Sequence, residues 1–333
     1  MGQGAFIFGC AGARLEPREA RFFREADPWG FILFARNVDT PDLLYRLTNE
    51  LREAVGREAP ILIDQEGGRV QRMREPDWRE FLPPMEQVDL TLERHGEEGA
   101  LRAMWLRGRL IAEDLHDVCI DVNCAPTLDV ARPDTHPFLR NRCFSDSPDL
   151  VAAMGQALVE GMAAGGVAAV MKHLPGHGRG TVDSHLGLPR VTADLEELQT
   201  DFAPFKALND LPMAMSAHIV IDAIEPEVPA THSEKAIALI REEIGFGGLL
   251  MTDDVSMEAL SGTVVERAQR AIAAGCDLAL HCNGDMAEME ALAALGALGE
   301  AAQTRANAAA DARPTYEPID IREIDAEFRS LTG

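Results

Sequence analysis

Residues 167–173, "VAAVMKH", form an apolar run that ends in a lysine and a histidine. A run that is apolar on both faces is typical of a strand buried on both sides in a parallel sheet. Seven similar runs recur along the chain: "AFIFGC" (5–10), "WGFILFARN" (29–37), "PILIDQ" (60–65), "IDVNCAPTLDV" (120–130), "PMAMSAH" (212–218), "GGLLMTDD" (247–254) and "DLALHCN" (277–283). The sequence therefore predicts eight buried parallel strands.

Amphipathic segments lie between these runs, for example at 41–56, 145–166 and 232–248. Ser or Asp stands near the start of two of them, and they end in glycine, as is typical of helix caps. Eight strands that alternate with helices predict the α/β class and a (β/α)8 TIM-type barrel. A doubly wound open sheet is the alternative, but no glycine-rich fingerprint follows the first run.

No low-complexity linker or block of charge interrupts the chain, so residues 1–333 are expected to form a single (β/α)8 barrel catalytic domain. The alanine-rich residues 291–312 predict the final helix. Residues 313–333 are expected to be a C-terminal tail packed on the barrel.

The formal net charge of -24 repels phosphate backbones and anionic membranes. The six cysteines lack the short paired spacings of zinc sites and the density of a disulfide scaffold, which indicates reduced thiols in a cytoplasmic protein. No apolar segment approaches the roughly 20 residues that span a bilayer. We expect a small-molecule ligand, with no nucleic acid, membrane or obligate protein partner and no cofactor.

Polar side chains close six of the predicted strands, at the barrel end where active sites are built. They are Asp64, Asp129, Lys172, His173, His218, Asp253, Asp254, His281 and Asn283. A single Asp or His in such a place is usually a helix cap or a satisfied rim residue, but six strands ending this way favour a site. Adjacent Asp253 and Asp254 cannot both face one centre, so one is expected to react while the other caps. Arg69 and Arg72 fit a solvated helix start, but Arg72, like Arg142, could equally bind the oxygen atoms of a ligand.

Residues 172–185, "KHLPGHGRGTVDSH", have three possible functions. The glycine spacing does not match a phosphate-binding fingerprint. His173 and His177 are four apart, as helical zinc ligands are, but Pro175 and the glycines prevent that helix, so only loop geometry could form a metal site. Acid/base chemistry is the third, because Asp183 can orient His185 and stabilise its protonated form.

These motifs, with "IDQEGGRVQR", "NRCFS", "MSAHI" and "MTDDVSM", resemble those of glycoside hydrolase family 3 β-N-acetylglucosaminidases, the single-domain enzymes that recycle bacterial cell-wall fragments. The resemblance runs from about Phe8 to Asn283. It implies that Asp253 is the nucleophile, His185 the general acid/base and Asp183 its partner. It also implies that five residues hold the sugar: Asp64, Arg72, Arg142, Lys172 and His173. Leu174 and Cys143 depart from the family pattern, which has Phe and Ser there.

The expected activity is that of a retaining exo-β-N-acetylglucosaminidase acting through a covalent glycosyl-enzyme, with no metal. Substrate-assisted hydrolysis is a competing mechanism. A phosphorylase on the same site is an alternative, because a histidine tolerates an approaching phosphate better than a second carboxylate does. Two hypotheses of other classes are a hydrolase with zinc held by His173, His177 and His185, and a sugar-binding protein without catalysis. The natural aglycone, a muropeptide or a chitin fragment, is left open.

Overall fold

The computed structural model describes residues 2–181 and 187–333. Eight parallel strands close into a barrel in the order β1-β12-β11-β9-β7-β6-β3-β2. The strands are β1 (Gly4–Gly9), β2 (Pro28–Leu33), β3 (Ile61–Ile63), β6 (Val122–Asn123), β7 (Ala168–Leu174), β9 (Met213–Ser216), β11 (Leu249–Asp254) and β12 (Leu278–His281). Each of the eight predicted runs supplies one strand, so the predicted (β/α)8 barrel is confirmed.

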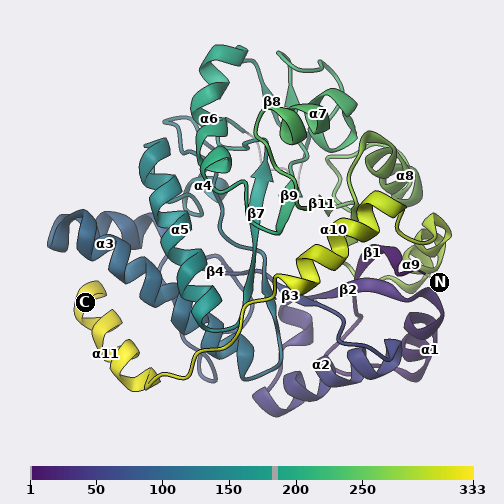
Figure 1. Ribbon diagram of the computed structural model, residues 1–333, viewed down its shortest axis with the longest axis horizontal. Helices are drawn as coiled ribbons and strands as arrows, with labels where there is room; N and C mark the ends of the chain where they lie inside the picture. The colour runs from purple at the N-terminus through teal and green to yellow at the C-terminus, as the bar shows by residue number, and fades with distance from the viewer. Residues whose placement is uncertain (1, 182–186) are drawn as a thin grey trace.

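Helices surround the barrel (Figure 1). They are α1 (Pro17–Ala26), α2 (Pro41–Val55), α3 (Pro84–His116), α5 (Pro148–Ala164), α6 (Leu195–Ala207), α7 (Glu234–Glu242), α8 (Val264–Ala274) and α10 (Glu300–Asp311), with the short α4 (Pro137–Arg140) and α9 (Met286–Leu292) and the C-terminal α11 (Ile321–Thr332). Two small sheets complete the fold, one of β4 (Gln65–Gly67) with β5 (Val70–Gln71), the other of β8 (Arg190–Val191) with β10 (Val220–Ile221).

Local sequence sets the ends of these helices. Thr40 caps α2 by accepting the backbone N–H of Leu43, and Pro41 occupies the first helical position, where its missing N–H is harmless. Gly56 ends the same helix with a φ of 68°, a conformation that favours glycine. At α8, Thr263 and Glu266 bond to each other's backbone N–H groups in a capping box.

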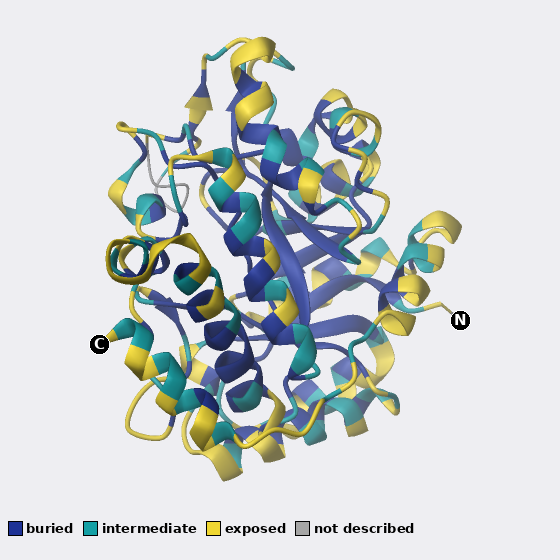
Figure 2. Cartoon of the chain, turned by 60° about the vertical axis from the view of Figure 1, so that its left-hand side comes forward, coloured by how far each residue is buried: buried dark blue, intermediate teal, exposed yellow. Residues whose placement is uncertain are grey.

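The strands carry apolar side chains on both faces, as their sequences predict. Ile7 of β1 packs inside the barrel, whereas its neighbours Phe6 and Phe8 pack against the helices beside Phe23 and Phe31. This alternation follows from the pleat of a strand. Figure 2 shows the buried strands at the centre and exposed residues on the outer faces of the helices. The barrel is therefore a packed core, and an open site can form only at its rims.

The prediction of a final helix at 291–312 is wrong. α9 ends at Leu292 and α10 begins only at Glu300; between them Gly296 has a φ of 76°, which is outside the α-helical region. The last helix is α11, which Asp320 caps and which packs against α3 (Figure 1). Among the described residues, no helix has the length and apolar character needed to cross a membrane.

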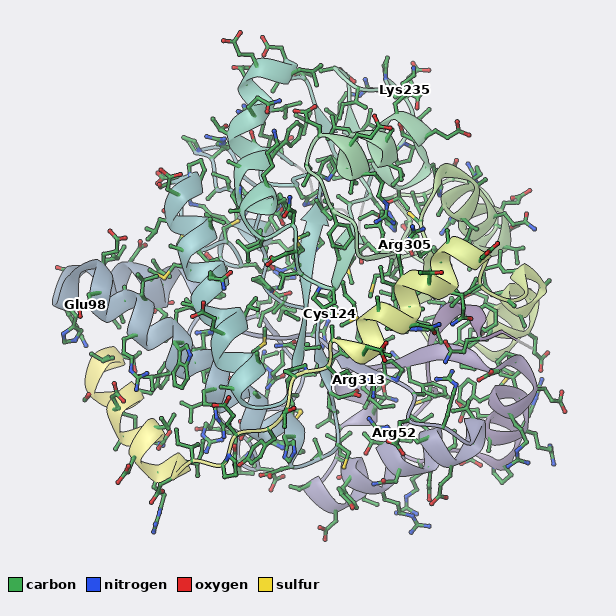
Figure 3. The ribbon with its side chains drawn as sticks, viewed as in Figure 1. Arg52, Glu98, Cys124, Lys235, Arg305 and Arg313 are labelled. Atoms are coloured by element: carbon green, nitrogen blue, oxygen red, sulfur yellow. The ribbon has the colours of Figure 1, made fainter. Side chains whose placement is uncertain are left out.

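Ion pairs tie the segment after α10 to the N-terminal end of the barrel strands. Arg313 and Arg52 approach the two carboxylate oxygens of Asp121 at 3.0 and 3.3 Å. Figure 3 labels both arginines, Arg52 on α2 and Arg313 just after α10. Asp121 also accepts the backbone N–H of Ile61 at 2.7 Å. Polar groups at this end of a TIM barrel serve stability, so the chemistry is expected at the opposite end.

Candidate active site

A pocket opens at the C-terminal ends of the barrel strands. Six of the residues that line it were predicted from the sequence to react or to bind sugar, and they come from different elements: Asp64, Arg72, Arg142, Lys172, His173 and Asp253. The structure therefore brings together side chains that are far apart in the chain. Asp183 and His185, the predicted acid/base pair, lie outside the described residues.

Asp64 at the end of β3 holds two cations at the pocket wall. Its Oδ1 accepts from Nζ of Lys172 at 2.8 Å, and its Oδ2 accepts from Nη2 of Arg72 at 2.8 Å. Arg72 reaches Asp64 because the β4–β5 hairpin turns the chain back beside β3. Burial alone would raise the pKa of Asp64, but Lys172 and Arg72 outweigh it and hold that pKa well below its usual range.

Glu66, which the sequence analysis did not single out, lies beneath the same wall. Arg142 donates to both of its oxygens at 2.9 Å, and Nζ of Lys172 lies 2.6 Å from Oε1. Glu66 does not line the pocket. Two of the three cations that the sequence predicts to bind the sugar, Arg142 and Lys172, thus share a buried carboxylate behind them.

Asp129 anchors the segment that carries the two described histidines of the loop. Its Oδ2 lies 2.7 Å from Nδ1 of His173, and its Oδ1 accepts the backbone N–H of His177 at 2.6 Å. Arg142 approaches Nε2 of His173 at 3.3 Å, and because a guanidinium only donates, Nε2 accepts and Nδ1 carries the proton toward Asp129. His173 therefore faces the pocket in a fixed orientation.

His177 also lines the pocket, and among residues 2–181 and 187–333 its Nε2 finds no hydrogen-bond partner. Burial lowers the pKa of its imidazole to about 4, although Asp129 opposes that shift. The side chain is therefore neutral near pH 7. The sequence singled out His177 only as a candidate metal ligand.

Asp253 at the end of β11 presents a carboxylate to the pocket. Within the described part of the chain, the only hydrogen bond to it comes from the backbone N–H of Asp254, at 2.8 Å to Oδ1. Burial alone would raise the pKa of Asp253. Its pKa nevertheless lies below the usual value, because of the nearby side chains of His218, His173 and Lys172 and the hydrogen bond from the N–H of Asp254. The group is an ionised carboxylate with an oxygen available to react.

Asp254 has a structural role, although not at a helix. Its oxygens accept from the backbone N–H and the hydroxyl of Ser256, at 3.0 and 2.6 Å, and from the backbone N–H of Cys282 at 3.2 Å. It closes the turn after β11 and ties β11 to β12. The next helix, α8, is capped by Thr263.

The remaining polar strand ends divide into two groups. His218 lines the pocket, held by Thr231 at 2.9 Å and by the backbone oxygen of Asp254 at 3.0 Å. His281 and Asn283 instead bond to Glu288 on α9, both at 2.7 Å, and are not among the pocket-lining residues.

Two aromatic rings complete the pocket, and the sequence analysis did not identify them. Phe34 follows β2 and lies under the guanidinium of Arg72, 5.0 Å from its carbon, while Phe138 on α4 lies 5.4 Å from that of Arg142. Aromatic rings beside cations suit the apolar faces and hydroxyl edges of a sugar. Aromatic residues are also common in cores, so nothing in the sequence distinguished these two.

The two departures from the family pattern lie away from the pocket lining. Leu174 is buried in the layer between barrel and helices, and Cys143 packs against Ala131 and Leu139. Within residues 2–181 and 187–333, no group of three His, Cys, Asp or Glu side chains is arranged to hold a metal ion.

The chain is similar to known proteins over most of its length. Residues 21–312 match the glycosyl hydrolase family 3 N terminal domain. The chain is 38% identical over 294 residues to a beta-hexosaminidase of Methylococcus capsulatus, an alignment that covers 87% of this chain and 86% of the relative. NagZ from Neisseria gonorrhoeae in complex with zinc ion has a TM-score of 0.88 at 28% identity, and the same protein in complex with N-trifluoroacetyl-D-glucosamine has 0.83 at 30%; both matches cover 100% of this chain and 99% of the neighbour.

Proposed function

The chain belongs to glycosyl hydrolase family 3 and is a glycoside hydrolase, and on that premise we propose that it is a retaining exo-β-N-acetylglucosaminidase. The proposed reaction removes terminal β-linked N-acetylglucosamine from peptidoglycan fragments through a covalent glycosyl-enzyme. The single observation that carries the proposal is the ionised Asp253 carboxylate, which faces a pocket walled by paired cations and histidines.

Asp253 acts as the nucleophile. One of its oxygens attacks the anomeric carbon and forms an ester, while the bond from that carbon to the leaving oxygen breaks. The hydrogen bond from the N–H of Asp254 holds one oxygen of the carboxylate, and no other described residue bonds to it. Water then cleaves the ester and gives the sugar with its original β configuration, because two inversions cancel.

The hydroxyl groups of the sugar bind to one wall of the pocket, which is made of Asp64, Arg72, Lys172, Arg142 and His173. Both oxygens of Asp64 already accept from a cation at 2.8 Å, which fixes the direction of their remaining lone pairs. Oriented donors and acceptors of this kind select a sugar over an apolar ligand. The gonococcal NagZ bound to N-trifluoroacetyl-D-glucosamine supports an N-acylated glucosamine as the sugar.

His185 is the proposed general acid/base and Asp183 its partner, on the strength of the family resemblance, since both lie outside the described residues. His185 would donate a proton to the leaving oxygen and later remove one from water. Asp183 would orient the imidazole and stabilise its protonated form. The cytoplasmic location and the peptidoglycan substrate stay predictions.

An assay of 4-nitrophenyl glycosides tests the proposal. We expect cleavage of the N-acetyl-β-glucosaminide and little cleavage of the β-glucoside, because polar groups that bind the acetamide are left unpaired by a hydroxyl. Asp253→Ala is expected to abolish turnover. Equal rates on both glycosides would contradict the substrate, and an active Asp253→Ala would contradict the nucleophile. Sugar 1-phosphate as the main product in phosphate buffer would show a phosphorylase instead.

A further inference from the structure

Glu66 contacts two proposed sugar-binding cations from the side away from the pocket. Arg142 uses Nε and Nη2 to donate to Oε2 and Oε1, both at 2.9 Å, and Nζ of Lys172 lies 2.6 Å from Oε1. Two parallel bonds to one carboxylate fix the plane of the guanidinium as well as its position. One side chain therefore sets the placement of both cations relative to each other.

The carboxylate itself is out of reach of a ligand. Glu66 is 4% exposed and is not among the residues that line the pocket, whereas Arg142 and Lys172 both are. Its Oε2 also accepts from the hydroxyl of Thr127 at 3.4 Å. Any effect of Glu66 on a bound sugar must therefore pass through the two cations.

The positive charges of Lys172 and Arg142 also require an anion at the position of Glu66. Lys172 and Arg142 are both buried, and two like charges without anions between them would repel each other at high cost. Burial alone would raise the pKa of Glu66, but Arg142 and Lys172 outweigh it and lower the pKa to about 2. The carboxylate stays ionised at every pH at which the protein would work.

The backbone of Glu66 is held rigidly from α3. Arg107, a fully buried arginine of that helix, donates to the backbone oxygens of Glu66 and Leu82 and to the side chain of Gln87. Gly67 follows with a φ of 101°, and a Cβ there would overlap the Arg107 guanidinium. Glu66 cannot shift without moving a buried helix contact, which is the support that a positioning group needs.

We propose that Glu66 is a positioning residue of the active site, which holds Lys172 and Arg142 in the geometry that binds the sugar. This inference rests on the proposed glycosidase function only for the identity of the ligand. Loss of the geometry weakens sugar binding, and it does so without removing any group that touches the substrate.

The test compares Glu66→Gln with the native chain, using 4-nitrophenyl N-acetyl-β-glucosaminide as substrate and N-acetylglucosamine as a competing ligand. We expect KM, and the dissociation constant of N-acetylglucosamine from calorimetry, to rise about 10- to 100-fold, the factor expected when hydrogen bonds to charged groups lose their geometry. A merely structural role would reduce kcat in proportion to the folded fraction and leave both constants unchanged. That outcome would overturn the proposal.

Asp277→Asn is the matched control. Asp277 is also a buried carboxylate that pairs two arginines, Arg241 at 2.9 Å and Arg305 at 2.5 Å, but it precedes β12 at the opposite end of the barrel. We expect it to lose stability with an unchanged KM. If Asp277→Asn raised KM as much as Glu66→Gln does, general destabilisation would explain the effect and the proposal would be wrong.

Glu66→Asp provides a second variant should Glu66→Gln not fold. It keeps the charge but shortens the side chain by one methylene, so that it cannot reach both cations. We expect a weaker affinity for N-acetylglucosamine with the native stability largely retained, and native affinity in this variant would contradict the proposal. If the native chain binds N-acetylglucosamine but cleaves no glycoside, the proposed function is refuted, and the dissociation constants alone decide the role of Glu66. If the native chain neither binds N-acetylglucosamine nor cleaves a glycoside, both proposals are refuted.

Discussion

Replacing Lys172 by methionine removes a buried cation while keeping most of the side-chain volume. Nζ of Lys172 lies 2.8 Å from Asp64 and 2.6 Å from Glu66, and the side chains of Lys172 and Glu66 are 2% and 3% exposed. Removing one partner of a buried ion pair typically costs about 3–5 kcal/mol, because the other charge stays desolvated. Arg72 and Arg142 still neutralise part of the remaining charge, so we expect about 3 kcal/mol.

The loss of unfolding free energy in Lys172→Met should depend on pH. Lys172 lowers the pKa of both carboxyl groups. In Lys172→Met these pKa values rise toward those of the unfolded chain. A lowered carboxyl pKa stabilises the fold above the unfolded pKa, and this contribution is lost as the pH falls through the folded pKa, so near neutral pH the native chain has more of this stabilisation than the variant has. The difference in stability between native and variant should therefore be larger at pH 7 than at pH 3.

Urea unfolding at both pH values measures this difference. Lys206→Met is the matched control, since Lys206 pairs with Glu243 at 3.4 Å on the surface and an exposed pair contributes only about 0–1 kcal/mol. A double variant with Lys172→Met and Glu66→Gln should lose less unfolding free energy than the sum of the losses in the two single variants. The reason is that Glu66→Gln removes a negative charge that Lys172→Met leaves unpaired. A loss in Lys172→Met as small as in the control, or one that does not change with pH, would refute this electrostatic reasoning.

Two further predictions concern the loop that carries His177. Burial lowers the pKa of His177 to about 4 from 6.5, so the protein should lose up to about 3 kcal/mol of stability as the pH falls from 6.5 toward 4. His177→Gln should show a shallower decline in urea midpoint over that range. An equally steep decline in the variant would contradict the assignment. At Gly178 a Cβ would overlap the backbone oxygen of Val130, so Gly178→Ala should lower the unfolding free energy by about 1–3 kcal/mol. Gly12 has open space around it, so Gly12→Ala should leave the unfolding free energy almost unchanged. Equal thermal midpoints for the two variants would refute the clash.

The sequence predicts the barrel well because each strand is buried on both faces. Residues 167–171, for example, must be apolar throughout to pack inside the barrel and against helices, and the same condition holds for the apolar parts of the other seven runs. The C-terminal region lacks that constraint. α11 packs on the outside, and α10 meets the barrel interior through the small side chains of Ala306 and Ala309. An alanine-rich segment of this kind fits a helix of almost any length, so the break at Gly296 could not be located.

The candidate site divides in the same way. Asp64, Lys172, His173 and Asp253 could be identified because each ends a strand, and strand ends meet at one rim. Glu66 lies in a hairpin beyond its strand, and its partner Arg142 is 76 residues away in the chain. Only the folded structure shows that the two meet, since no local pattern marks a carboxylate whose function depends on distant cations.

Trapping the glycosyl-enzyme tests the central claim most directly. A fluorinated N-acetylglucosaminide with a good leaving group slows hydrolysis of the covalent intermediate, so the protein should gain the mass of one fluorinated sugar. Peptide mass spectrometry should place that sugar on Asp253, which has an oxygen free to attack. A sugar on any other residue, or turnover that releases a cyclised acetamido product with no covalent adduct, would contradict the account.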